Sequence, residues 1–237
     1  MQKCAKLYEG KAKILYATDD PDCVIQYFKD DATAFNAKKK GTVDEKGVMN
    51  NSISAKVFEF LGQNGIPTHF LKLLSDREML VRKVEIVKVE VIIRNRAAGS
   101  LCRNYGVTEG RTLACPVLEF CYKEDVFNDP LMNETHILAL GIATEKEIAR
   151  IRELTLKINE LMKKFFLALN IELIDFKLEF GRHKGEIILA DEVSPDTCRL
   201  WEVGTGVRLD KDRFRNDLGN IKEGYQEVLK RVTGKAV

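Results

Sequence analysis

The sequence predicts an α+β fold, with strands and helices in separate parts of the chain rather than in strict alternation. Residues 1–84 contain mostly short strand-like runs, and residues 87–94 place apolar side chains at every second position, as a half-buried strand does. Residues 144–170 carry apolar side chains at helical spacing, which indicates a long amphipathic helix. Because the strands are grouped together, a doubly wound parallel sheet is disfavoured.

The elements expected before residue 85 are short. Gly10 permits a tight turn between the first two strands, and the polar segment 19–22 forms the next turn. A polar loop that includes residues 38–40 leads into the one helix of this part, which Gly62 and Gly65 end. The expected elements are strands over residues 5–9, 11–16, 24–28, 68–74 and 79–84, and a helix that begins near residue 48.

The elements expected after residue 85 are longer. Thr144 and Glu147 have the spacing of a capping box, which begins the long helix, and residues 181–185 form a turn between two strands. The expected elements are strands over residues 87–94, 171–180 and 186–192, and helices over residues 144–170 and 211–232. We therefore expect two lobes, a small β-rich lobe over residues 1–84 and a larger α+β lobe over residues 85–237.

The composition is that of a globular protein, since 45% of the residues are hydrophobic, 31% are charged and the formal net charge is +2. This net charge is too small to indicate a nucleic-acid or membrane partner, so we expect neither. The N-terminal residues lack the apolar run of a secretory signal, and no apolar stretch is long enough to span a membrane.

The six cysteines are scattered along the chain without a C-x-x-C pair. A disulfide framework is the alternative, but it is typical of shorter chains that are denser in cysteine. We expect free thiols in a reducing compartment, and hence a cytoplasmic protein. The three histidines share no motif, so a zinc site is not expected and any metal should be bound by carboxylates.

The most informative segment is the strand with the sequence LIDFKLEFG. Alternate side chains of a strand share a face, so Asp175, Lys177 and Glu179 point to one side and three apolar side chains point to the other. A half-buried strand at the edge of a sheet could alternate in this way for solubility alone. The next strand is apolar over residues 187–190 and yet ends in acids, which favours a functional site.

These acids are Asp191 and Glu192, which a hairpin brings back beside the first strand. Several carboxylates and a lysine that meet at the end of a buried hairpin need charge compensation, which a metal ion with bound phosphates supplies. Mg²⁺ binds through one or two carboxylates together with nucleotide phosphates. Glu179 and Asp191 are therefore the predicted ligands of a Mg²⁺ cofactor.

A basic cluster near the N-terminus is a candidate phosphate site. Gly10, Lys11, Ala12 and Lys13 would lay two ammonium groups along a phosphate chain, with Lys11 and Lys13 on one face of a strand. Solvated lysines beside a hairpin turn are the alternative. The chain contains no Walker A sequence and no G-x-G-x-x-G, so neither a P-loop nor a Rossmann site is indicated.

A second basic cluster is RNRAAGS, which is followed by Arg103. Arg94 and Ser100 could bind a phosphate where a strand gives way to a short helix, although a solvated basic turn would have the same composition. Arg199 closely follows the predicted metal ligands and should face the same pocket. The mixed-charge segment DKDRFR, residues 210–215, is expected to lie on the solvated surface.

Seven stretches of the chain together resemble the SAICAR synthetase family along nearly the whole length. In the family's order, they are LYEGKAK, TAFNAKKKG, RNRAAGS, DPLMNETH, LIDFKLEFG, LADEVSPDTCRLW and LDKDRFR. The resemblance implies a two-lobed fold, similar to that of kinases or ATP-grasp enzymes, with a nucleotide between the lobes. It also implies an ATP-dependent ligase of purine biosynthesis.

The family joins L-aspartate to the carboxylate of 5-amino-1-(5-phospho-D-ribosyl)imidazole-4-carboxylate, here called the imidazole ribonucleotide, using ATP and Mg²⁺. The resemblance implies that ATP phosphorylates this carboxylate and that the aspartate amine attacks the acyl phosphate. Phosphoryl transfer requires mainly positioning and charge neutralisation, which lysines and metal-bound acids provide without a protein nucleophile. The expected partners are the three small-molecule substrates and, on family grounds, further copies of the chain in a homo-oligomer.

The matching motifs imply a role for twelve residues. The implied nucleotide contacts are Gly10, Lys11, Ala12 and Lys13, the implied Mg²⁺ ligands are Glu179 and Asp191, and the implied ribonucleotide contacts are Arg94, Ser100 and Arg199. Lys177 would lie between the nucleotide and the acyl acceptor. Asp175 and Asp129 would lie near the imidazole carboxylate. Lys177 and Asp175 are the candidate catalytic residues.

The chain departs from the family pattern at two places. Glu202 and Val203 stand where an aspartate and a lysine are expected, and Asn36 stands where some relatives have an acid, so no L-aspartate contacts are assigned. Two other classes stay open. A kinase of a small polyol could use a similar D-x-K strand, but would need no ribonucleotide phosphate site. A nucleic-acid-binding module could use the basic clusters, but would leave the buried acids without a purpose.

Overall fold

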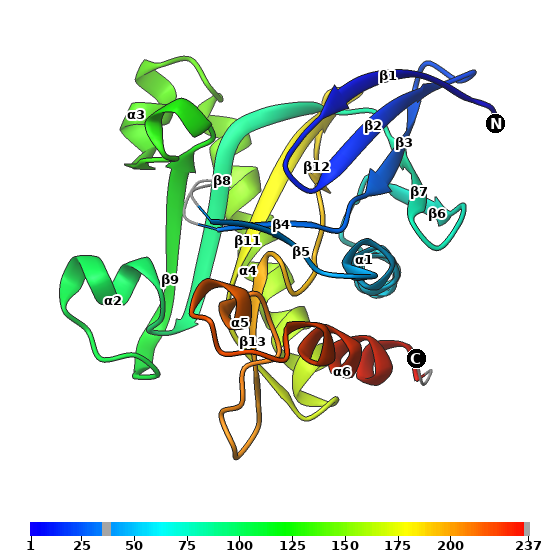
Figure 1. The fold of residues 1–237 in the computed structure, drawn as a ribbon. Helices are drawn as coiled ribbons and strands as arrows, with labels where there is room; N and C mark the ends of the chain where they lie inside the picture. Colours follow the sequence, from blue (N-terminus) through cyan, green and yellow to red (C-terminus); the bar gives the residue numbers. More distant parts are fainter. Residues whose placement is uncertain (35–38, 235–237) are drawn as a thin grey trace.

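The first sheet is antiparallel and has five strands in the order β1-β2-β3-β7-β6 (Figure 1). The computed structural model describes residues 1–34 and 39–234. The strands are β1 (Lys3–Glu9), β2 (Lys13–Thr18), β3 (Cys23–Phe28), β6 (Phe70–Leu73) and β7 (Glu78–Arg82). All five were predicted, with one correction: Lys11 lies in the turn before β2, in which the Gly10 amide donates to the Lys13 carbonyl oxygen at 2.8 Å. Lys11 and Lys13 therefore do not share the face of one strand.

A short ribbon and a helix follow the third strand. The sequence predicted a polar loop before the helix, but two strands pair there. Lys39 and Lys40 lie on the second of them, whereas Asn36 and Lys38 are outside the described residues. The helix packs its buried apolar side chains against the first sheet. The elements are β4 (Asp31–Ala34), β5 (Lys39–Thr42) and α1 (Lys46–Gln63).

The second sheet has six strands, and all the pairings between them are antiparallel. The path β10-β9-β8-β11-β12 describes five of them, and β13 also pairs with β11. Three strands, β9, β10 and β13, were not predicted from the sequence. The bounds are β8 (Glu85–Arg96), β9 (Thr112–Tyr122), β10 (Leu131–Met132), β11 (Ile171–His183), β12 (Glu186–Ala190) and β13 (Cys198–Glu202).

One edge of β11 pairs with β8, and the other edge pairs with two strands in succession. β12 pairs with residues 179–183 and β13 pairs with residues 171–176. Between these two strands the chain leaves the sheet as a loop, residues 191–197. The Lys177 amide donates to the Thr197 carbonyl oxygen at 2.8 Å, so this loop lies beside the middle of β11.

The long helix was predicted correctly, including its capping box between Thr144 and Glu147. Its buried side chains pack against β11 and belong to the main hydrophobic core. Because this helix covers one face of the sheet, the polar side chains of β11 are directed to the opposite face. The helices between β8 and β11 are α2 (Ser100–Tyr105), η1 (Asp125–Phe127), α3 (Glu134–Ala139) and α4 (Glu145–Leu167).

The C-terminal segment differs from the prediction of one helix over residues 211–232. It forms two helices, α5 (Asp212–Arg215) and α6 (Ile221–Thr233). Asp217, Gly219 and Asn220 between them have φ angles of 53°, 72° and 48°. These angles lie in the left-handed region, which a right-handed helix cannot include. After this break α6 packs against α1, so the end of the chain returns to its first helix (Figure 1).

The α+β class is confirmed, because antiparallel sheets and separately grouped helices make up the structure. The change from the first sheet to the second falls between Arg82 and Glu85, close to the expected lobe boundary. The main core nevertheless includes side chains from both sides of this point, so the division into lobes of residues 1–84 and 85–237 stays a prediction. Within the described residues, no helix is both long and apolar enough to cross a bilayer.

Candidate active site

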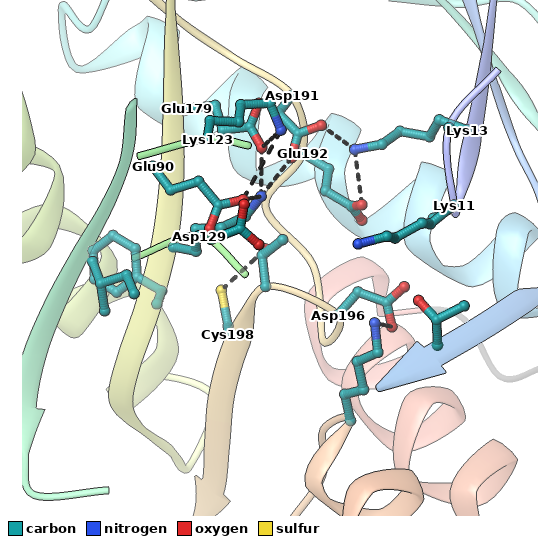
Figure 2. Close-up of a pocket in the computed structure, with 18 of the residues that line it drawn as sticks. Lys11, Lys13, Glu90, Lys123, Asp129, Glu179, Asp191, Glu192, Asp196 and Cys198 are labelled. Carbon is teal, nitrogen blue, oxygen red and sulfur yellow. Dashed lines mark hydrogen bonds and ion pairs between the residues drawn. The ribbon is translucent and has the colours of Figure 1, made fainter. Parts of the chain in front are cut away.

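A cavity of about 830 Å³ opens between the β1–β2 hairpin, the second sheet and the C-terminal segment (Figure 2). Charged side chains dominate its walls. The acidic ones are Glu9, Glu90, Asp125, Asp129, Asp175, Glu179, Asp191, Glu192 and Asp196. The basic ones are Lys11, Lys13, Arg94, Arg103, Lys123, Lys177, Arg199, Lys211 and Arg215. Most small-molecule pockets are largely apolar, so this balance of charges indicates highly charged ligands.

The floor of the cavity is one face of β8 and β11, in which directly opposed residues of the two strands share a side. The opposed pairs that line the cavity are Asp175 with Arg94, Lys177 with Ile92, and Glu179 with Glu90. The intervening apolar residues of β11 are buried in the main core, and they are Phe176, Leu178 and Phe180. The two predicted faces of this strand are thus confirmed.

Carboxylates and lysines gather at one end of the floor. Glu179 and Glu90 are directly opposed, and like charges at such positions repel each other. Lys177 Nζ offsets this repulsion, since it lies 2.5 Å from Glu179 Oε1 and 3.1 Å from Glu90 Oε1. Lys123 Nζ adds a second contact at 2.9 Å from Glu179 Oε1. The Glu179 side chain is only 4% exposed, so water screens these contacts weakly.

Lys13 connects the N-terminal hairpin to this end of the cavity. Its ammonium group contacts the Asp191 carboxylate and lies 2.9 Å from Glu192 Oε1. Figure 2 shows Lys13 extending from the hairpin toward these two acids, with Lys11 below it. Lys177 Nζ also lies 3.6 Å from Asp191 Oδ2. Asp191 is therefore held between a lysine of the first sheet and a lysine of the second.

The ionisation states follow from these contacts. Burial alone would lower the pKa of Lys177, but Glu179, Glu90 and Asp191 outweigh burial and raise this pKa well above its usual value. Burial alone would raise the pKa of the Asp191 carboxyl, but Lys13 and Lys177 outweigh burial and lower it. Lys177 and Asp191 are therefore both charged at neutral pH.

Two arginines surround Asp175 at the other end of the floor. Asp175 pairs in register with Arg94 on one side and with Arg199 of β13 on the other. Arg94 Nη1 lies 2.6 Å from Asp175 Oδ2, and Arg199 Nη1 lies 2.8 Å from the same oxygen. The three side chains thus form a buried ion cluster, in which Arg94 also pairs with Glu119 and Arg199 also pairs with Asp212.

The Arg94 guanidinium group is 2% exposed and donates to several protein oxygens. Besides Asp175, it donates to Glu119 at 2.9 Å, to the Ala98 carbonyl oxygen at 3.2 Å and to Ser100 Oγ at 2.7 Å. Because Ser100 Oγ accepts this hydrogen bond, its own proton is left to donate elsewhere. Ser100 lines the cavity, so this proton can reach a ligand there.

Gly99 and Asp212 hold Arg199 in place. Arg199 Nε donates to Asp212 Oδ2 at 2.7 Å. A Cβ atom added at Gly99 would lie 2.6 Å from Arg199 Nη2, so only glycine leaves room for the guanidinium group there. Gly99 also has a φ of 58°, which other residues rarely adopt.

A third wall of the cavity is formed by the loop 191–197 and α5. Asp196 is buried in this loop and accepts from Lys46 Nζ at 2.5 Å and from the Tyr225 hydroxyl at 2.6 Å. Lys211 Nζ lies 3.9 Å from Asp196 Oδ1. This wall therefore joins the first helix, the loop and the C-terminal segment.

The expectation of a solvated surface over residues 210–215 was wrong. Asp210 and Asp212 are buried, and the Lys211 side chain is 14% exposed. The charges of this segment are turned inward because they pair with the site, as Asp212 does with Arg199. A mixed-charge run in a sequence does not distinguish between these two orientations.

The family model of SAICAR synthetase matches residues 6–232. The chain belongs to the SAICAR synthetase family. A phosphoribosylaminoimidazole-succinocarboxamide synthase of Chlorobium luteolum is 57% identical, over 99% of this chain and 98% of that protein. A crystal structure of the synthase from Ehrlichia chaffeensis is 47% identical, with a TM-score of 0.95 over 98% of this chain and 100% of that one. A SAICAR synthetase in complex with ADP is 44% identical, with a TM-score of 0.94 over 97% of this chain and 98% of that one.

All twelve residues that the SAICAR synthetase motifs suggested line the one cavity. They are Gly10, Lys11, Ala12, Lys13, Arg94, Ser100, Asp129, Asp175, Lys177, Glu179, Asp191 and Arg199. They come from the N-terminal hairpin, from β8, from the segments that follow β8 and β9, and from β11, the loop 191–197 and β13.

Several charged residues of the SAICAR synthetase cavity were missed. Glu90 and Lys123 lie beside Glu179 only because of the register between strands, and no local motif marks them. Asp196 lies within the motif LADEVSPDTCRLW but was not singled out. The sequence feature that could have identified Asp196 is its position two residues before Cys198, on the same loop as Asp191.

Two predicted residues lie at the rim of the cavity. Lys11 Nζ contacts Asp125 Oδ1 at 2.6 Å, and both side chains are well exposed. Asp129 follows this segment, has a φ of 46° and accepts from the Glu124 amide at 3.0 Å. These two residues therefore lie on the more open part of the site.

One of the two departures from the SAICAR synthetase pattern, at Glu202 and Val203, lies away from the described part of the cavity. Glu202 accepts from Arg231 at 2.6 Å and does not line the cavity, and Val203 is exposed beside it. Asn36 is outside the described residues.

Proposed function

We propose that this protein is an ATP-dependent ligase that joins L-aspartate to the carboxylate of the imidazole ribonucleotide, giving SAICAR, ADP and phosphate in purine biosynthesis. The observation that carries the proposal is a single cavity with a carboxylate–lysine cluster at one end and an arginine–serine cluster at the other. Membership of the SAICAR synthetase family supports the same reaction. All three substrates are anionic, which agrees with nine basic residues on the walls of the cavity.

The nucleotide is assigned to the end that holds the N-terminal hairpin. Gly10 and Ala12 would let the backbone approach the nucleotide phosphates closely. Lys11 and Lys13 would provide two ammonium groups for the same phosphates. The complex of a relative with ADP supports a nucleotide site in the family. Lys13 would then exchange part of its contact with Asp191 for a phosphate oxygen.

The donor set at this end also fits Mg²⁺. Glu179 and Asp191 are proposed as its ligands, since their carboxylates lie on the cavity wall and share the ammonium group of Lys177. Glu90 and Glu192 add two further carboxylates nearby, which leaves this end with four acids against three lysines. When bound, Mg²⁺ would neutralise phosphate charge and draw electron density from the transferred phosphoryl group.

The imidazole ribonucleotide is assigned to the arginine end. Arg199 and the Ser100 hydroxyl would bind its phosphate and ribose, together with Arg94, which also donates to Ser100 Oγ and so leaves the Ser100 proton for the ligand. The ribonucleotide carboxylate would then point along the floor toward Lys177. Asp175 and Asp129 are assigned to the side of the imidazole ring.

The proposed mechanism has two steps. An oxygen of the imidazole carboxylate attacks the γ-phosphorus of ATP, and the bond from that phosphorus to the β-phosphate oxygen breaks, which releases ADP. The aspartate amine then attacks the acyl carbon, and the bond from that carbon to the bridging oxygen breaks, so that phosphate leaves with the electron pair and the nitrogen loses a proton to water. Lys177 is charged and lies between the two ends, so it can neutralise the transferred phosphoryl group. Asp175 holds the two arginines in place.

An assay of ADP release with and without L-aspartate tests the proposal. The ligase should release ADP and form SAICAR only when the ribonucleotide and L-aspartate are both present. A polyol kinase would release ADP without aspartate, and a nucleic-acid-binding module would release none. Either result would overturn the proposed function.

The proposal includes a cytoplasmic location, which agrees with six cysteines that are all unpaired in the structure. We also expect a homo-oligomer, as stated above, and no nucleic-acid or membrane partner. Gel filtration with light scattering measures the oligomeric state directly.

A further inference from the structure

The third wall of the cavity carries two cations without a proposed ligand. Lys211 directly precedes α5 and Arg215 ends it, and both line the cavity. Residues four apart on a helical segment lie on the same side, so the two cations face the cavity together. Asp212 between them pairs with Arg199 and also with Arg215, each at 2.7 Å, so Lys211 is the less satisfied of the two cations. The ATP and ribonucleotide phosphates have their cations on the other two walls.

The ammonium group of Lys211 has no close acceptor in the described part of the chain. Its nearest ion-pair partner there is Asp196, at 3.9 Å, which is beyond hydrogen-bonding distance. Asp196 already accepts from Lys46 at 2.5 Å and from Tyr225 at 2.6 Å. The Lys211 side chain is 14% exposed and lines the cavity, so little water surrounds its ammonium group. A buried ammonium group without a close acceptor is stabilised when an anion binds to it.

Lys211 differs from the lysines of the carboxylate cluster. Burial lowers the pKa of Lys211, and Asp196 and Glu192 raise it too little to compensate, while Arg215 and Lys46 lower it further. The pKa of Lys177, by contrast, is raised by its three carboxylates, which outweigh burial. An incoming carboxylate would therefore stabilise the charged form of Lys211 more than that of Lys177.

The position of Lys211 also suits the incoming amino acid. The Lys211 amide donates to the Pro195 carbonyl oxygen at 3.1 Å, which places it over the loop 191–197. That loop lies beside the middle of β11, where the Lys177 amide bonds to Thr197. The acyl carbon is assigned to the same part of the floor. A ligand held at Lys211 is thus near the point of attack.

We propose that Lys211, with Arg215 beside it, binds a carboxylate of the amino-acid substrate in a subsite between Asp196 and α5. This inference rests on the proposed ligase function. L-Aspartate carries two carboxylates, and after the assignments above this wall is the remaining cationic one. Lys211 orients the amino acid so that its amine faces the acyl phosphate.

Succinate is the probe that isolates this contact, because it carries the two carboxylates of aspartate without the amine. In Lys211→Met, the Ki of succinate against aspartate and the KM of aspartate should both rise about tenfold or more, as expected for the loss of a charged hydrogen bond. The KM values of ATP and of the ribonucleotide should change by less than about twofold. Lys163→Met is the matched control, since Lys163 is exposed on α4 and pairs with Glu160.

Lys211→Arg gives a second readout that does not depend on removing the charge. In the wild type, the Ki of succinate should rise with pH as Lys211 loses its proton, since the deprotonated amine does not attract a carboxylate. In Lys211→Arg the Ki should stay flat over the same range, because arginine keeps its charge. The charged groups facing this position, Asp196, Glu192, Arg215 and Lys46, are the same in both proteins.

Three results would overturn the subsite. Unchanged succinate Ki in Lys211→Met together with a lower kcat would indicate proton transfer rather than binding. A rise confined to the ribonucleotide KM would assign Lys211 to that substrate. If Lys211→Met fails to fold, an equal pH dependence of Ki in wild type and Lys211→Arg would exclude the contact. Absence of aspartate-dependent ADP release in the wild type would instead overturn the proposed function itself.

Discussion

Lys177 contacts more carboxylates than any other lysine of the cavity. Its ammonium group lies 2.5 Å from Glu179, 3.1 Å from Glu90 and 3.6 Å from Asp191. Its raised pKa keeps the group charged, so it is suited to neutralising phosphate charge and unsuited to accepting a proton. Single side chains of this network are therefore expected to act through electrostatics. Removing one acid disturbs the balance among all of them.

We expect that Glu179→Gln or Asp191→Asn lowers turnover about a hundredfold or more, as seen for preorganised electrostatic groups elsewhere, and leaves the fold intact. The substituted amides fill the same volume but do not bind Mg²⁺ as carboxylates do. Turnover is measured as ADP formation over a range of magnesium concentrations. Glu172→Gln is the control on the same strand, because Glu172 pairs with Arg96 outside the cavity. Near-wild-type turnover at limiting magnesium would remove the metal assignment.

Cys198 lines the cavity but is not expected to act as a nucleophile. It is 2% exposed, and burial raises the pKa of its thiol, so the reactive thiolate is scarce. Among the residues that the structure describes, no histidine lines the cavity to serve as a base. Cys198→Ser should therefore keep most of the wild-type turnover. With oxygen-labelled carboxylate, one labelled oxygen should appear in the released phosphate. An inactive variant with unlabelled phosphate would favour a covalent route.

At the scale of elements, β11 organises the site, and its properties were visible in the sequence. The alternation of Asp175, Lys177 and Glu179 with apolar residues predicted both faces, and the acids after β12 predicted the cluster. What stayed hidden depends on register between distant strands. Lys123 follows β9, which has no clear alternation, and it meets Glu179 only through the pairing of β9 with β8.

The C-terminal segment, in contrast, could not be predicted from its local sequence pattern. Its apolar spacing resembles one helix, and nothing local shows that three residues between α5 and α6 take left-handed angles. The inward orientation of α5 is decided by Asp212 pairing with Arg199, a contact that only the fold creates. Local patterns therefore predicted the floor of the site better than its third wall.

The start of α2 offers a test at this scale. Gly99→Ala should raise the KM of the ribonucleotide and leave the KM of ATP nearly unchanged, because the added Cβ would lie 2.6 Å from Arg199 Nη2 and displace it. Gly106→Ala is the control at the other end of the same helix. Gly106 has a φ of 65° and a ψ of 24°, a left-handed conformation that alanine adopts more readily than the φ of 58° and ψ of −126° of Gly99, and its Cβ would meet open space. An unchanged ribonucleotide KM in Gly99→Ala would mean that ribonucleotide binding does not depend on the room that Gly99 leaves for Arg199.

At the scale of the whole molecule, one buried and one exposed group of polar contacts lie where α1 meets α6. Lys46, which begins α1, is 1% exposed and binds Asp196 of the loop 191–197, which also binds Tyr225 of α6. Lys222 of α6 binds Asp44 and Glu45, just before α1, at the surface. A lysine can therefore be removed from a buried group or from an exposed group in the same region of the fold.

Lys46→Met should lower the free energy of unfolding by about 3–5 kcal/mol, because it leaves the Asp196 carboxylate buried without its cation. Lys222→Met should have little effect, since surface pairs are screened by water. Urea unfolding followed by circular dichroism measures both. A small decrease in the free energy of unfolding of Lys46→Met would show that Tyr225 and Lys211 compensate the Asp196 charge without Lys46.

The distances along the chain between paired residues have a consequence for synthesis. Lys13 and Asp191 are 178 positions apart, and Lys46 and Asp196 are 150 apart. A ribosome makes the N-terminal lysines first and their carboxylates only in the last quarter of translation. During most of that time the first sheet and α1 can form while Lys13 and Lys46 still lack these acids. A nascent chain thus acquires the described cavity late, after β13 and α5 have emerged, and nucleotide capture should begin only then.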